Sequence, residues 1–213
     1  MDNLDLALYL VTDSTDMDEA HFLHVVEQAC EGGVTLVQLR EKEKGGLAYL
    51  QLAEKVLRIT DRYGIPLIID DRVDIAIAVG AAGVHVGQVD IPVQAARRLL
   101  GEGKIVGATA KTVAQAKRAK EEGADYLGVG AIFPTTTKVV TIRTDVSTLN
   151  EIAAETAMPI VAIGGLNASN MHVLYGSMAH GIAVVSAIMK SGDPQATARQ
   201  LKKQVMEHLR IKK

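Results

Sequence analysis

The stretch "EEGADYLGVG", residues 121–130, points to the fold class, because a polar helical pattern passes through one glycine into a short apolar run. Gly123 suits the end of a helix, and "YLGVG" has the length and composition of a buried parallel strand. The same transition recurs in "EGGVTLV" (31–37), "RYGIPLI" (62–68), "VGAAGVHV" (79–86) and "AHGIAVV" (179–185). The chain is therefore predicted to repeat one strand-and-helix unit.

Eight apolar runs of this kind follow one another, each succeeded by a segment of helical periodicity. They cover residues 6–12, 34–40, 66–70, 83–87, 105–109, 126–130, 159–164 and 181–186. Eight successive units favour a closed (β/α)8 barrel, the TIM barrel, over an open doubly wound sheet. No linker or low-complexity tract interrupts them, so residues 1–213 are predicted to form a single barrel domain of the α/β class.

The amino-acid composition indicates how the core is filled and which kinds of partner are not expected. The chain is 48% hydrophobic but only 3% aromatic, so Val, Ile, Leu and Ala must fill the core, as they do in barrels. A net charge of -2 gives no electrostatic reason to expect a nucleic acid or an anionic membrane as partner. No uncharged apolar stretch reaches the roughly 18 residues of a membrane span, and the N-terminus lacks a signal-peptide pattern. A cytoplasmic protein with small-molecule partners is expected, and a homo-oligomer stays open.

Polar residues matter most where they follow a strand, because barrel enzymes carry their sites at the carboxyl ends of the strands. The second run ends in "VQLREK", with Gln38, Arg40 and Lys42 at alternate positions. A strand extending that far would point all three side chains to one side, which predicts a cluster of donors. The alternative is a strand that runs out into a solvated, charged loop.

Carboxylates follow the next two runs. The third run ends at Asp70 and Asp71, and the fourth is followed by Gln88 and Asp90. Mg²⁺ takes oxygen ligands and is commonly held by one or two carboxylates together with substrate phosphates. Asp71 and Asp90 are therefore predicted to form half of a magnesium site. Taken singly, each aspartate also suits a helix N-cap or a loop.

The last two runs end in a pattern that suits phosphate binding. Gly164 and Gly165 follow the seventh run, and Ser186 follows the eighth. Loops after strands seven and eight of such barrels often bind phosphate through backbone N–H groups, which glycine lets approach closely. The alternative reading is a tight turn without a ligand.

The segment "PTTTK", residues 134–138, follows the sixth run. Thr135 and Thr137 could donate to phosphoryl oxygens, and Lys138 could supply a point charge. A solvated turn is the equal alternative.

His85, inside the fourth run, is interpreted as a hydrogen-bonded core residue, and the single cysteine, Cys30, as buried and inert. No set of nucleophile, base and orienting group is visible, which argues against covalent catalysis.

Taken together, these residues resemble the thiamin phosphate synthase family over nearly the whole chain. The resemblance is carried by "VQLREK" (37–42), "DDRVDIAIAVGAAGVHVGQVDIP" (70–92), "GADYLGVGAIFPTTTK" (123–138) and "IGGL" (163–166). It implies a cytoplasmic, Mg²⁺-dependent (β/α)8 transferase of vitamin B1 synthesis. Such an enzyme joins 4-amino-2-methyl-5-hydroxymethylpyrimidine diphosphate to a thiazole phosphate, or to its carboxylated form, and releases diphosphate and thiamin phosphate.

The resemblance also implies roles for individual residues. The pyrimidine diphosphate would contact Gln38, Arg40, Lys42, Asp70, Thr109 and Lys138. The metal ligands would be Asp71 and Asp90. The thiazole phosphate would be surrounded by Thr135, Thr136, Thr137, Gly165, Val185 and Ser186. The chain departs from the family pattern at Asp70, where Asn is expected, at Thr109, where Ser is usual, and in the segment after Lys138.

The implied chemistry is dissociative. Diphosphate leaving a benzylic-type carbon gathers negative charge, while the electron-rich aminopyrimidine carries positive charge. Mg²⁺ and the cations Arg40, Lys42 and Lys138 would stabilise the leaving group. Three alternatives remain at this point: a thiazole tautomerase-like paralogue, which has no need for the diphosphate and metal set; a non-catalytic ligand-binding barrel; and another phosphosugar-type barrel enzyme.

Overall fold

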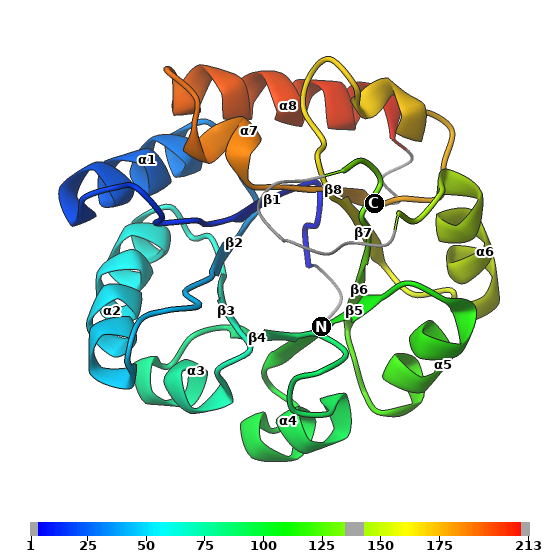
Figure 1. The fold of residues 1–213 in the computed structure, drawn as a ribbon, viewed down its shortest axis with the longest axis horizontal. Coiled ribbons are helices and arrows are strands. Elements are labelled where there is room, and N and C mark those ends of the chain that lie inside the picture. Colours follow the sequence, from blue (N-terminus) through cyan, green and yellow to red (C-terminus); the bar gives the residue numbers. More distant parts are fainter. Residues whose placement is uncertain (1–3, 135–142, 210–213) are drawn as a thin grey trace.

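The computed structural model describes residues 4–134 and 143–209. Its eight parallel strands pair in chain order and close into a barrel, which confirms the predicted fold (Figure 1). The strands are β1 (Leu8–Val11), β2 (Leu36–Leu39), β3 (Leu67–Asp70), β4 (Gly83–Val86), β5 (Ile105–Ala110), β6 (Tyr126–Gly130), β7 (Ile160–Ile163) and β8 (Gly181–Val184).

Helices form an outer ring around the barrel (Figure 1). They are α1 (Glu19–Glu31), α2 (Gly46–Arg62), α3 (Val73–Val79), α4 (Val93–Leu100), α5 (Val113–Glu121), α6 (Val146–Thr156), α7 (Ser186–Met189) and α8 (Pro194–His208). Between β7 and β8 the structure has only a short 3-10 helix, η1 (Met171–Leu174), where the sequence pattern predicted an α-helix. The side chains of Asn167 and Asn170 bond to nearby backbone N–H groups there, which competes with helix formation.

Two apolar layers result from the alternation of side chains along each strand. One set of strand residues packs against the helices, and the other fills the barrel. The inner set is small, and its buried members are Leu6, Tyr9, Val11, Leu36, Ile68, Tyr126, Val161 and Ala183. Two tyrosines therefore supply the largest side chains of the barrel interior.

Gly107 makes room for the rings inside the barrel. The register places it between His85 on β4 and Tyr126 on β6, each of which is its Cα partner. A Cβ atom at Gly107 would lie 2.2 Å from Cζ of the Tyr126 ring. Because glycine has no side chain, the rings of His85 and Tyr126 reach across β5 with their centroids 5.5 Å apart.

The strands are shorter than the apolar runs in the sequence. In particular, β2 ends at Leu39, so the strand does not extend to Lys42, which was the condition for the alternation of Gln38, Arg40 and Lys42. Arg40 and Lys42 lie in the connection to α2, where strand alternation no longer sets the direction of their side chains. The position of these two cations depends on the residues that they contact across the barrel rim.

Two further findings concern regions away from the rim. Cys30 is buried in α1, and burial, followed by the carboxylate of Glu27, raises the pKa of its thiol to about 12. The interpretation of Cys30 as buried is thus confirmed. Among the described residues, none of the helices has the length and apolar character needed to cross a membrane.

The gap at Gly107 leads to a test of the barrel interior. Gly107→Ala should lower the free energy of unfolding by about 1–3 kcal/mol, because the added methyl group overlaps the Tyr126 ring. Urea denaturation measures the change. Gly103→Ala is the matched control, since nothing lies within 4 Å of its Cβ position, and it should stay within about 0.5 kcal/mol of the parent. Equal stability of both variants would contradict this account of the interior.

Candidate active site

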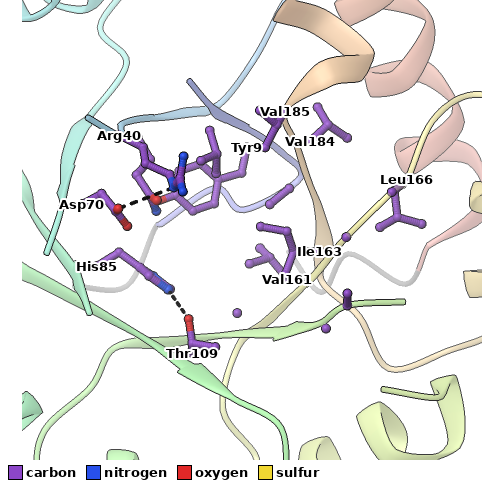
Figure 2. Close-up of a pocket in the computed structure, with 18 of the residues that line it drawn as sticks. Tyr9, Arg40, Asp70, His85, Thr109, Val161, Ile163, Leu166, Val184 and Val185 are labelled. Atoms are coloured by element: carbon purple, nitrogen blue, oxygen red, sulfur yellow. Dashed lines mark hydrogen bonds and ion pairs between the residues drawn. The ribbon is translucent and has the colours of Figure 1, made fainter. Parts of the chain in front are cut away.

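A pocket with a volume of about 160 Å³ opens at the carboxyl ends of the strands. Figure 2 shows a polar wall facing an apolar one. The polar wall carries Tyr9, Arg40, Asp70, His85 and Thr109, from β1 to β5. The apolar wall carries Val161, Ile163, Leu166, Val184 and Val185, from β7, β8 and the segments that follow them. The pocket can therefore hold a ligand with one charged side and one apolar side.

The cations after β2 meet the carboxylates after β3. Lys42 Nζ lies 2.7 Å from Asp70 Oδ2 and also donates to Asp71, while Arg40 Nε lies 3.8 Å from Asp70 Oδ2. Gln38 does not join them, because it points into the barrel and its Nε2 donates to the Tyr9 hydroxyl at 2.7 Å. The predicted donor cluster is thus divided between an ion-pair group at the rim and an interior amide.

Burial and ion pairing have opposite effects on the pKa values of Asp70 and Lys42. Asp70 is 8% exposed, and burial raises the pKa of its carboxyl although the charges of Lys42 and Arg40 lower it. Burial alone would lower the pKa of Lys42, but the carboxylates of Asp70 and Asp71 outweigh that effect and raise it. The lysine is therefore firmly protonated, and it is held by two carboxylates.

Asp71 and Asp90 lie together at the ends of β3 and β4. Asp71 has a left-handed backbone conformation with φ of 58°, and Asp90 Oδ2 accepts a 2.9 Å hydrogen bond from the Gly87 N–H group. Burial raises the pKa of Asp90, and the adjacent carboxyl group of Asp71 raises it further. Two carboxyl groups, which are potential hard oxygen ligands, thus lie next to each other. Within residues 4–134 and 143–209, no three His, Cys, Asp or Glu side chains gather to hold a metal unaided.

The opposite rim is made from the ends of β7 and β8. Gly164 and Gly165 have φ of 106° and 62°, backbone conformations that residues other than glycine rarely adopt. A Cβ atom at Gly165 would also lie 2.7 Å from the Pro134 carbonyl oxygen, so the turn packs tightly against the segment after β6. Gly165, Val185 and Ser186 all line the pocket, and Ser186 is exposed at the start of α7.

Four predicted site residues, Thr135, Thr136, Thr137 and Lys138, lie outside the described residues. The remaining site predictions fall on the rim or on the interior face of the barrel. Thr109 is on β5, it lines the pocket, and it is partly exposed.

Among the pocket residues that the sequence analysis did not place at the site, three have polar side chains: Tyr9, Lys111 and, as a lining residue, His85. Side chains two positions apart on a strand point to the same face. Tyr9 therefore shares a face with Val11, and Lys111 would share one with Thr109, so this alternation would have identified both. His85 was correctly interpreted as hydrogen-bonded, since it contacts Thr109, but it faces the pocket as well.

A chain of hydrogen bonds crosses the barrel below the pocket. From Gln38 it runs to the Tyr9 hydroxyl, which lies 2.8 Å from the Tyr126 hydroxyl. The Tyr126 hydroxyl lies 3.0 Å from His85 Nδ1, and His85 Nε2 lies 3.0 Å from Thr109 Oγ1. Residues of β2, β1, β6, β4 and β5 are thereby connected in one network.

The sequence and the fold match known proteins closely. Residues 8–188 match the sequence profile described as thiamine monophosphate synthase. A thiamine-phosphate synthase of Methanobrevibacter smithii is 47% identical over 204 residues, which cover 96% of this chain and 97% of the relative. A thiamine-phosphate synthase of Enterococcus faecalis is 54% identical over 184 residues, covering 86% and 87%.

Solved structures of other proteins have the same fold as this chain. A thiamine phosphate pyrophosphorylase from Pyrococcus furiosus is 34% identical with a TM-score of 0.85, covering 96% of this chain and 97% of its own. A 3-hexulose-6-phosphate synthase from Salmonella typhimurium has a TM-score of 0.73 at 19% identity, a likeness that shows the fold alone. From the profile match and the identities to its relatives, the chain belongs to the thiamine monophosphate synthase family.

Proposed function

We propose that the pocket joins 4-amino-2-methyl-5-hydroxymethylpyrimidine diphosphate to 4-methyl-5-(2-phosphooxyethyl)thiazole, or to its carboxylated form, releasing diphosphate and thiamin phosphate. The family membership makes the chain a transferase of thiamine biosynthesis. The observation that carries the assignment is the division of the pocket. Arg40 and Asp70 line one side of the pocket, with Lys42, Asp71 and Asp90 beside them at the same rim. Gly164, Gly165 and Ser186 line the opposite side. Two phosphorylated substrates can then meet between the two rims.

The carboxylate pair supports a magnesium site. Asp71 and Asp90 are close enough for the carboxyl group of Asp71 to raise the pKa of Asp90, and both offer the oxygen ligands that Mg²⁺ prefers. Two carboxylates are sufficient when substrate phosphates supply further oxygens. Bound there, the ion would add positive charge beside the diphosphate oxygens.

Arg40 and Lys42 act on the leaving diphosphate. Both cations pair with Asp70 in the structure, and a diphosphate entering the pocket would compete for their N–H groups. A pair of unit charges at about 4 Å is worth about 1 kcal/mol in water but roughly 4 kcal/mol at an effective dielectric constant near 20. Because negative charge grows on the diphosphate as its bond to carbon breaks, these contacts strengthen along the reaction.

The pyrimidine ring belongs in the deeper, polar part of the pocket. Gln38, Asp70 and Thr109 surround that region, and they offer acceptors and a hydroxyl to an aminopyrimidine. An electron-rich ring held there can carry the positive charge that develops at its exocyclic carbon. The thiazole nitrogen then attacks that carbon in a dissociative, carbocation-like reaction.

The thiazole phosphate belongs at the opposite rim. Gly165 and Ser186 would hold its phosphate, and Val185 would pack on its ring. Thr135, Thr136, Thr137 and Lys138 stay predictions for the same substrate pair, resting on the sequence resemblance alone.

The alternatives have less support. A tautomerase-like paralogue would bind a thiazole phosphate without needing the cations and carboxylates of the other rim, and the relatives are named synthases. A non-catalytic barrel could bind the same ligands, so only an assay of diphosphate release separates it from a synthase. The single domain over residues 1–213, the cytoplasmic location and the absence of nucleic-acid and membrane partners remain proposals that rest on the sequence, and a homo-oligomer stays open.

Diphosphate release tests the proposed function. The purified chain, supplied with both substrates and Mg²⁺, should release diphosphate and form thiamin phosphate in equal amounts. Omitting the thiazole phosphate or adding excess EDTA should abolish both products. Ligand binding without diphosphate release, under conditions where the P. furiosus relative is active, would favour the non-catalytic alternative.

Replacement of one carboxylate tests the metal site. Asp90→Asn should raise the Mg²⁺ concentration for half-maximal activity at least about tenfold, since an amide is a weaker ligand than a carboxylate. The Asn side-chain oxygen can still accept from the Gly87 N–H group, so folding should be preserved. The matched control is Asp74→Asn, an exposed aspartate paired with Arg72, which should leave the Mg²⁺ dependence unchanged. Equal Mg²⁺ dependence in both variants would refute the assignment.

Asp70 gives a test through stability. Its folded-state pKa is raised above the ordinary value of 3.8, so the folded chain binds more protons than the unfolded chain. Stability therefore decreases as the pH rises through the window that begins near 3.8. Asp70→Asn removes this penalty and should be more stable than the parent at neutral pH in EDTA, with the gain vanishing in acid. Urea denaturation at several pH values measures it, and lower stability at neutral pH would contradict it.

A further inference from the structure

Tyr126 lies one layer below the pocket and does not line it. Its side chain is fully buried, and its hydroxyl contacts the Tyr9 hydroxyl on one side and His85 Nδ1 on the other. A phenol carries a single proton and can accept with its oxygen. Tyr126 therefore satisfies both contacts only by donating to one group and accepting from the other.

Only two neutral arrangements of protons meet this condition. In the first, Tyr9 donates to Tyr126, Tyr126 donates to His85 Nδ1, and His85 Nε2–H donates to Thr109. In the second every one of these bonds is reversed, and Thr109 donates to His85 Nε2. Gln38 donates to Tyr9 in both. In each arrangement one hydroxyl proton takes no part in these bonds. It is the Thr109 proton in the first arrangement and the Tyr9 proton in the second.

Burial selects the first arrangement. The leftover proton needs an acceptor in the pocket or in water, because a buried donor without a partner is costly. Both residues line the pocket, but Thr109 is partly exposed there, whereas Tyr9 is only 1% exposed. The first arrangement also places His85 in the neutral Nε2–H form. The network then presents the Thr109 hydroxyl to the pocket as a hydrogen-bond donor.

We propose that Tyr126 is a positioning residue that fixes the Nε2–H tautomer of His85 and thereby makes Thr109 a donor to a ring nitrogen of the aminopyrimidine. This inference rests on the proposed function. An aminopyrimidine has ring nitrogens that accept and an amino group that donates. The β5 wall supplies the donor, and on the other side of the pocket Asp70 is an acceptor when ionised. A hydroxyl by itself can donate or accept, so the direction comes from the buried network.

The tautomer can be observed without any activity. In the parent protein carrying ¹⁵N-labelled histidine, the ring resonances of His85, assigned by their loss in His85→Gln, should be those of a neutral Nε2–H imidazole. In Tyr126→Phe the Nδ1 resonance should shift, because that nitrogen loses its donor. Tyr49→Phe is the matched control, since it removes another buried phenol that bonds to the Leu39 carbonyl, and it should leave His85 unchanged. An Nδ1–H or cationic His85 in the parent would overturn the proposal.

Kinetics test the consequence for the substrate. Tyr126→Phe and Thr109→Val should each lower kcat/KM for the pyrimidine diphosphate about tenfold, the value of one hydrogen bond, while KM for the thiazole phosphate stays within about twofold. The double variant should have the same kcat/KM for the pyrimidine diphosphate as the less active of the two single variants, because both changes remove the same contact. Thr109→Ser, which keeps the hydroxyl, should restore activity.

The outcomes separate the two proposals. Additive losses in the double variant, or equal losses for both substrates, would show that Tyr126 acts only on the stability of the barrel, and would overturn the inference. A parent protein that releases no diphosphate would refute the proposed function instead. The His85 tautomer is read from the parent, so the inference is also decided if Tyr126→Phe fails to fold.

Discussion

The barrel closes around a hydrogen-bonded set of rings, and the rest of the site depends on that packing. Tyr9 and Tyr126 fill an interior that otherwise holds small and aliphatic side chains, and the gap at Gly107 lets Tyr126 reach His85. Hydroxyls and an imidazole buried at this depth must bond to one another, because an unpaired polar group there is costly. The floor of the pocket is therefore both packed and polar, with its hydrogen bonds set by the barrel itself.

Above this floor, the rim holds a nearly buried carboxyl group beside two cations. Asp70 is nearly buried beside Arg40 and Lys42, and burial still outweighs the two cations in raising its pKa. Buried ion pairs commonly recover less energy than their desolvation costs. Such an arrangement is understandable at a site for an anionic substrate, because the cations are already in place and a diphosphate needs only to displace a carboxylate.

The two rims differ in how they are built. At the β2 to β4 side, long side chains converge from separate loops, so their positions depend on ion pairs such as Lys42 with Asp71. At the β7 and β8 side, the backbone itself is shaped by Gly164 and Gly165, which pack against the segment after β6. A rim of charged side chains facing a rim of backbone suits two substrates that must approach each other while one of them loses a charged group.

The barrel and the location of the site could be predicted from the sequence, because the strand-and-helix period and the glycine transitions are local properties of the chain. Asp70, Asp71, Asp90 and Gly165 could be placed at the rim for the same reason: each lies at the end of a strand or within four residues after it. The tertiary structure decided the rest. It ended β2 at Leu39, turned Gln38 inward and joined Tyr9 to Tyr126, 117 positions apart. Contacts of that separation depend on strand register and on which side chain fills each layer, and no local pattern encodes either.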